Sequence, residues 1–152
     1  MKKICLMLAL MLAMATNMMA QSVDDIFKEF RDMPNVDFVN LPKAMIGAIT
    51  AKTGKDKLKD VEMLRALNIE NNKDLQDKFA KKVQGISKKG YEEMVNSNEE
   101  NEKTQILVKT DGEVLTEILI IHLATDESGI VQICGKIRPE DLNDLDLEKL
   151  GK

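Results

Sequence analysis

The sequence predicts a single α+β domain built on an antiparallel sheet of about five strands, with the helices packed mainly on one face. The 152 residues, 43% of them hydrophobic, suffice for one domain with a buried core. Helical and strand-like periodicities alternate through most of the chain, and three strand-like runs then follow one another across short turns. Strands with such short connections pair antiparallel, so these three should form a C-terminal meander.

The first twenty residues have the pattern of a secretory signal peptide. Two lysines precede an apolar run over 4–15, and small and polar residues follow up to Ala20. The run is shorter than the roughly 20 apolar residues that span a bilayer. We therefore expect a periplasmic or secreted protein, without stable membrane insertion after cleavage. The domains expected are a signal peptide at 1–20 and a single α+β domain at 21–152.

The cleavage site and the cysteines bear on how the protein is exported. Ala13-x-Ala15 fits the small-residue rule for cleavage better than Ala20 does, but a cut after Ala20 keeps the next helix whole. Cys5 precedes the apolar run, whereas a lipoprotein cysteine follows it, so we expect no lipid anchor. The mature chain then keeps one thiol, Cys134, and cannot form an internal disulfide.

The charge and aromatic content argue against nucleic acid as a partner. Loss of Lys2 and Lys3 takes the 22 basic residues to 20 against 26 acidic ones, a net charge of −6. A clearly acidic domain with no evident basic stripe is a poor candidate for binding nucleic acid. Aromatic residues make up only 3% of the chain, which weakens any function that needs stacking platforms.

The first half of the mature chain alternates between helices and strands. A helix is expected over 22–33, because Ser22 and Asp25 have the spacing of a capping box. Alternation over 35–41 predicts a strand, and Pro42 is placed in the first turn of a helix that continues to Thr50. The Lys-rich stretch 52–60 is interpreted as a solvated connection, with a basic site for acidic lipid or protein as the less favoured alternative.

The middle of the chain is expected to hold a strand and the longest helix. Residues 61–69 alternate as a strand. Asn71 and Asp74 then form a cap pattern for a helix over 71–95, which Gly90 breaks or bends. Residues 96–103 are interpreted as a polar, acidic turn.

The last third predicts the meander and a closing helix. Strands are expected at 104–110, 113–123 and 130–137, with Asp111–Gly112 as a favoured hairpin dipeptide. Apolar residues on both faces of 118–121 predict that the second of these strands is central. Residues 138–151 carry a proline in the first turn and a glycine at the end, which indicates a helix.

His122 and Cys134 are the candidate catalytic residues, as a weak alternative to an expectation of none. They lie on adjacent strands, and one register of the turn at 125–129 would place them opposite each other as a Cys–His dyad. A slip of one residue would separate them, because side chains alternate between faces. A packed thiol and a strand-end imidazole are the favoured interpretation. We expect no cofactor and no metal site, because one His and one Cys fall short of a zinc ligand set and residues 141–148 lack the glycine of a calcium loop.

Several short patterns resemble the DUF4252 family, small exported proteins of Bacteroidetes with no assigned function. They are Leu64-x-x-Leu67 before Asn71, Asp74 and Leu75; Tyr91-Glu92-Glu93-Met94; Glu117-Ile118-Leu119-Ile120; Ile133-x-Gly135-x-Ile137; and Asp141–Leu142. The resemblance implies an exported α+β domain and assigns no catalytic residue. Some members of that family look like lipoproteins, and this chain departs from them because no cysteine follows its apolar run.

Together these observations favour an exported, non-catalytic binding or protein-interaction domain of the cell envelope. Its expected partner is another envelope protein. The alternative is a small periplasmic thiol-dependent enzyme that uses Cys134 with His122.

Overall fold

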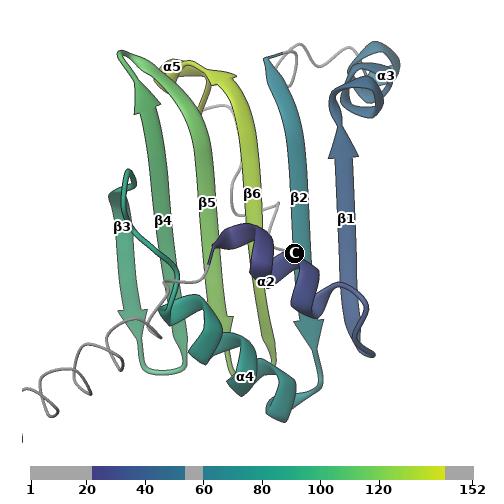
Figure 1. The fold of residues 1–152 in the computed structure, drawn as a ribbon, viewed down its shortest axis with the longest axis vertical. Coiled ribbons are helices and arrows are strands. Elements are labelled where there is room, and N and C mark those ends of the chain that lie inside the picture. The colour runs from purple at the N-terminus through teal and green to yellow at the C-terminus, as the bar shows by residue number, and fades with distance from the viewer. Residues whose placement is uncertain (1–21, 54–59, 143–152) are drawn as a thin grey trace, which may run out of the picture.

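The computed structural model describes residues 22–53 and 60–142 as one sheet with helices packed against it (Figure 1). The expected signal peptide and the expected closing helix beyond residue 142 lie outside the described residues. The elements in chain order are α2 (Val23–Phe30), β1 (Val36–Pro42), α3 (Lys43–Thr53), β2 (Val61–Glu70), α4 (Lys73–Gln84), β3 (Glu92–Glu99), β4 (Glu102–Asp111), β5 (Val114–Ala124), β6 (Glu127–Ile137) and α5 (Pro139–Leu142).

The strands form one antiparallel sheet in the order β1-β2-β6-β5-β4-β3. This arrangement confirms the predicted α+β class and the predicted C-terminal meander. Helix α4 carries the chain from β2 to the far edge of the sheet, and the meander then returns it until β6 lies beside β2. Strands β1 and β3 are therefore the two edges.

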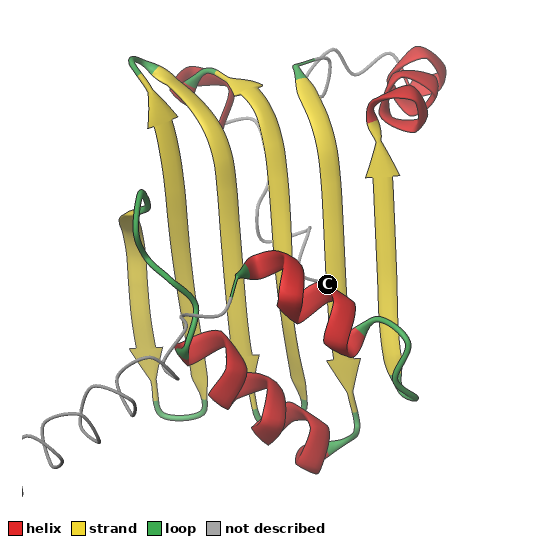
Figure 2. Ribbon diagram, in the orientation of Figure 1, coloured by secondary structure: helices red, strands yellow, loops and turns green. Residues whose placement is uncertain are grey.

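Helices α2 and α4 cover one face of the sheet (Figure 2). The core on this helix-covered face is centred on three phenylalanines, Phe27, Phe30 and Phe79, which pack on inward side chains of the central strands. A second apolar cluster lies on the opposite face, where Ile46 of α3 packs with residues of β2, β4, β5 and β6. As predicted, β5 is central and contributes to both clusters, with Leu119 in the first and Ile118 in the second.

The helix caps show how local sequence sets the helix starts. The predicted capping box of α2 is present, since the Asp25 amide donates to Ser22 Oγ and the Ser22 amide donates to the Asp25 carboxylate. Helix α4 is capped one residue later than predicted, by Asn72, whose side chain accepts from the Leu75 amide at 3.1 Å. Asn71 instead has a φ of 55°, a left-handed conformation that asparagine tolerates.

Two other local predictions need correction. Pro42 is the last residue of β1, opposite Met63, and α3 begins at Lys43. A proline is accepted there because β1 is an edge strand, in which alternate amides face away from the neighbouring strand. The turn at 125–129 is also shorter than predicted, because β5 continues to Ala124 and β6 begins at Glu127.

The largest error concerns residues 85–103. The predicted long helix ends at Gln84 with Gly85 as its C-cap, and the expected helix end and polar turn are instead strand β3, a turn at 100–101 and the start of β4. This adds a sixth strand to the sheet. All eight residues of β3 are exposed, so the strand carries none of the apolar alternation by which a half-buried strand is recognised.

Candidate functional site

The structure does not bring His122 and Cys134 together. In the β5–β6 ladder His122 lies opposite Gly129 and Cys134 lies opposite Glu117. The two side chains are thus offset by five positions along the ladder, about 17 Å at the rise of a β-strand. Five is an odd number of residues, so they also project from opposite faces of the sheet. The register that would form a dyad is therefore not the one observed.

His122 lies among polar side chains near the end of the sheet. Its Nδ1 is 3.3 Å from Thr104 Oγ1, on the neighbouring strand β4, and 3.6 Å from Glu102 Oε1. The side chain projects from the face opposite α2 and α4, because Leu119 and Ile121 of the same strand pack under those helices. The imidazole thus has two polar neighbours, the Thr104 hydroxyl and the exposed Glu102 carboxylate, and we interpret His122 as a structural residue near the end of a strand.

Cys134 is a half-buried thiol on the helix-covered face, between Met63 and Glu117 on its two neighbouring strands. Burial, and then the nearby Glu117 carboxylate, raise the pKa of Cys134 to about 11, outweighing the opposing influence of Arg65 and Lys109. A reactive cysteine needs the opposite environment, one that favours the thiolate at neutral pH. The surroundings of Cys134 keep it protonated.

We expect Cys134 to react slowly with iodoacetamide in the folded protein. A pKa of about 11 in place of 9.0 makes the thiolate fraction at pH 8 about 100-fold smaller. Between pH 7 and pH 10 the alkylation rate should climb about tenfold per pH unit without a plateau, because this whole range lies below the pKa. Alkylation followed by intact mass, with the protein in denaturant as the control, measures this. Fast labelling at pH 7 with a plateau would restore the thiol-enzyme hypothesis.

A connected group of polar side chains lies beside Cys134 on the same face. The Arg65 guanidinium donates through Nε and Nη2 to Gln132 Oε1, at 2.9 and 2.5 Å. The Gln132 amide in turn donates to Glu117, which also accepts a hydrogen bond of 2.7 Å from the Tyr91 hydroxyl. Lys109 Nζ lies 3.5 Å from the Glu117 carboxylate. We call Arg65, Gln132, Glu117, Tyr91 and Lys109 the polar network.

The polar network joins the first helix to the start of β3. At one end Arg65 pairs with Asp24 of α2 at 2.6 Å and lies 4.5 Å from the centre of the Phe27 ring. At the other end the Lys109 Nζ atom lies 4.3 Å from the centre of the Tyr91 ring, and Tyr91 is the residue that immediately precedes β3. Burial and the hydrogen bond to Glu117 raise the pKa of Tyr91, so its hydroxyl remains a donor at neutral pH.

Sequence reasoning missed this network, although one signal pointed to it. Glu117 occupies a buried position in β5 immediately before the apolar run at 118–121, where a carboxylate is found only when it has partners. Those partners come from two other strands and one loop, so nothing in the sequence identified them. No buried side-chain nitrogen or oxygen in the described residues lacks a hydrogen-bond partner, so the buried groups of the network are all bonded within the protein.

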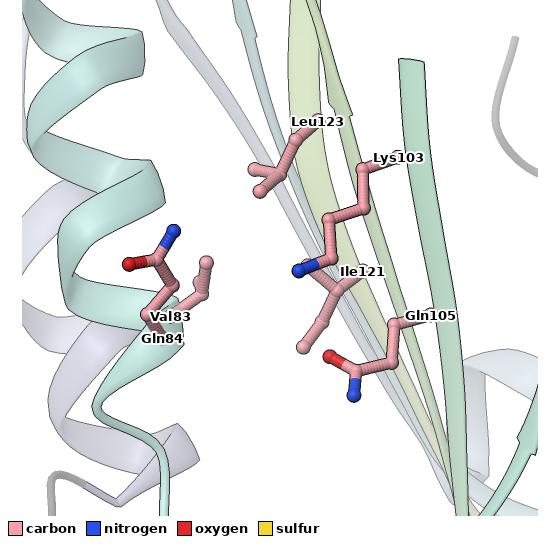
Figure 3. Close-up of a pocket in the computed structure, with 6 residues that line it drawn as sticks. All are labelled: Val83, Gln84, Lys103, Gln105, Ile121 and Leu123. Carbon is pink, nitrogen blue, oxygen red and sulfur yellow. The ribbon is translucent and has the colours of Figure 1, made fainter. Parts of the chain in front are cut away.

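Two hollows adjoin α4. Figure 3 shows the smaller one, where Val83 and Gln84 of α4 face Ile121 and Leu123 of β5 and Lys103 and Gln105 of β4. Its volume of about 20 Å³ is room for about one water molecule. A larger and more open hollow of about 370 Å³ lies between α4 and the turns at the end of the sheet. Its walls include Lys73, Asp77, Glu99, Glu100 and Glu102, whereas small-molecule sites are usually lined by apolar side chains.

Chemistry-bearing groups are sparse in the part of the chain that the structure describes. No three His, Cys, Asp or Glu side chains there are grouped so that they could hold a metal ion. None of the described helices combines the length and the apolar character needed to cross a membrane. The large exposed apolar side chains lie on the edge strands β1 and β3 and on α3 beside β1, and we take these as the candidate functional surfaces; the side chains are Val39, Met45, Ile49, Met94 and Val95.

Comparison with known proteins identifies the family. The family described as "Domain of unknown function (DUF4252)" matches residues 27–145, so the chain belongs to it, as the sequence patterns predicted. The match begins within α2 and extends beyond α5, so it includes all six strands. No curated protein and no solved structure matches the chain.

Proposed function

We propose that this DUF4252 domain is a non-catalytic protein-binding domain of the cell envelope, which captures an extended, basic segment of another envelope protein on the free edge of β3. The observation that carries the proposal is β3 itself, an edge strand whose eight residues are all exposed. Addition of a strand to an exposed sheet edge is a recurrent mode of peptide recognition, in which backbone hydrogen bonds supply the affinity.

The hairpin geometry identifies the backbone groups available on this edge. Strands β3 and β4 are joined by a two-residue turn closed by the pair Glu99–Glu102. In such a hairpin the closing pair is hydrogen-bonded across the strands, and bonded pairs then alternate with non-bonded pairs. Asn96, opposite Gln105, falls in a non-bonded pair. Its amide and carbonyl should therefore point away from β4, toward an incoming strand.

The charge of β3 indicates what kind of strand would pair there. Glu92, Glu93 and Glu99 are acidic, and the strand contains no lysine or arginine. The Glu93 carboxylate accepts hydrogen bonds from Gln105 and Asn96, which lower its pKa. Two copies of β3 paired edge to edge would bring like charges together, which destabilises a sheet. A segment that carries lysine or arginine would gain from the same charges.

Exposed apolar side chains on β3 offer additional contacts. Met94 is 57% exposed and lies at the irregularity in the β3–β4 ladder, between Glu93 and Val95. Val95 is 42% exposed. Methionine adapts its shape to varied partners, so it suits a surface that contacts an extended peptide.

The proposal is tested by removing one outward amide. Asn96→Pro removes an N–H that makes no bond within the sheet, and we expect it to reduce partner capture from native envelope extracts at least about tenfold. Asn96→Ala is the matched control, because both variants lose the side-chain bond to Glu93 and only the proline loses the amide. Capture by the alanine variant should stay within about twofold of the wild type.

Captured proteins are identified by mass spectrometry, and contact with β3 is mapped by cross-linking from position 95. The proposal requires a partner that cross-links there through an extended segment with lysine or arginine. It is rejected if both variants capture the same partner equally well, or if the cross-links map only to other elements. Thermal unfolding of both variants checks that β3 remains folded.

A further inference from the structure

Helix α3 exposes most of its apolar residues. Between Lys43 and Lys52 the helix contains seven residues that are alanine, glycine, methionine or isoleucine, and six of them are exposed. Ile46 is the exception, buried to 3% exposure in the cluster on the face opposite α2 and α4. A helix of this composition is normally buried, so its exposure indicates a surface used for contact.

The larger exposed side chains of α3 lie on one side of the helix. Met45, Ala48, Ile49 and Lys52 are spaced i, i+3, i+4 and i+7, which places them along one stripe. Met45 is 51% and Ile49 is 40% exposed. We call these four residues the α3 stripe. Figure 1 shows α3 beyond the end of β1, at the edge of the sheet opposite β3.

The charge of α3 is opposite to that of the whole chain. The chain carries a net charge of −4, but α3 contains Lys43 and Lys52 and no acidic residue. Two copies of α3 packed side by side in the same direction through the stripe would bring their two Lys52 side chains together, which disfavours that self-association contact. Lys52 lies in the stripe and no acidic residue lies beside it on the helix, so an anionic surface that covers the apolar stripe also pairs with this lysine.

We propose that the α3 stripe docks the domain on an anionic lipid surface. Met45 and Ile49 would enter the boundary between headgroups and acyl chains, as the apolar sides of interfacial helices do. Lys52 would keep its charge among the phosphates while its stem lies along the apolar layer. Eleven residues at 1.5 Å per residue are too few to span a bilayer, so this contact is peripheral.

Docking through α3 is distinct from strand capture by β3. The two surfaces lie at opposite edges of the sheet, so a domain resting on a membrane through α3 would leave the β3 edge accessible to a protein. Either activity can therefore fail without the other, and variants at the two edges separate them.

The test is sedimentation of the protein, as isolated from cells and with its N terminus verified by intact mass, with lipid vesicles. We expect binding to vesicles of equal parts phosphatidylglycerol and phosphatidylcholine and no binding to phosphatidylcholine alone. Raising the salt from about 0.1 M to about 1 M shortens the screening length from about 10 Å to about 3 Å and should release the protein. Met45→Ser should weaken binding about tenfold, and Lys52→Ser about fivefold.

Met94→Ser is the matched control, because Met94 is similarly exposed at the other edge of the sheet. It should leave vesicle binding unchanged. The proposal is overturned if the wild type does not bind anionic vesicles, if it binds both kinds of vesicle equally, or if Met94→Ser weakens binding as much as Met45→Ser. A concentration-dependent dimer that Met45→Ser abolishes in sedimentation velocity would also overturn it, because a second copy would then occupy the stripe.

Discussion

Replacing Gly135 with alanine is expected to lower the free energy of unfolding by about 2–4 kcal/mol. A Cβ at this position would lie 2.2 Å from the Asp60 carbonyl oxygen and 3.0 Å from the Val61 Cα. Both atoms belong to the backbone, so no side chain can rotate away. The Asp60 carbonyl also accepts a hydrogen bond from the Lys136 amide at 3.0 Å, which the displacement would weaken. Denaturant unfolding followed by far-UV circular dichroism measures the change.

A second glycine provides the control for this substitution. Gly47 lies in α3, and a Cβ there would meet no atom within 4 Å. Gly47→Ala should therefore raise stability by about 0.5–1 kcal/mol, because alanine is the better helix former. If Gly135→Ala were as stable as the wild type, that result would contradict the close approach of the Asp60 carbonyl to Gly135 of β6.

Replacing Glu117 with alanine is expected to cost about 2–4 kcal/mol of stability. Residue Glu117 is 9% exposed, and its carboxylate accepts hydrogen bonds from Tyr91 and Gln132 in addition to pairing with Lys109. Its removal leaves the Gln132 amide buried without that acceptor. Lys109 is 41% exposed and can turn to water, so its lost pairing adds little. The change is measured by denaturant unfolding.

A double-mutant cycle tests whether the polar network acts as one unit. Tyr91→Phe alone should cost about 0.5–1.5 kcal/mol, and together with Glu117→Ala it should cost less than the sum of the two by a similar amount. Glu113→Ala, at an exposed position in the β4–β5 turn, should stay within about 0.5 kcal/mol of the wild type. Strict additivity of Tyr91→Phe and Glu117→Ala would show that the hydrogen bond between them adds no stability.

The elements with strong local signals were predictable. The cap at Ser22, the alternation of 61–69 and the apolar run at 118–121 each follow from periodicity and hydrogen-bonding rules that involve neighbouring residues. Strand β3 could not be predicted in the same way. It is held in place by pairing with β4 at the edge of the sheet. Neither of its faces is buried, so it needs no apolar side chains and its sequence resembles a polar turn.

The candidate site depended on a quantity that the sequence leaves open. Whether His122 meets Cys134 is decided by the β5–β6 register, and the short turn at Thr125–Asp126 sets that register with His122 opposite Gly129. The same ladder brings Cys134 to Glu117, whose carboxylate helps to keep the thiol protonated. One register therefore separates the catalytic pair and builds the environment that suppresses the thiolate.

The sequence by itself determined the α+β class, the meander and the family, because these depend on apolar patterning and turn residues that act over a few positions. The tertiary structure alone decided which side chains meet across strands and which edges stay open. Arg65, Gln132 and Glu117 lie far apart in the chain and become neighbours only when β2, β6 and β5 pair in one register. Because side chains alternate between the faces of a strand, that register determines the surroundings of every side chain in the sheet.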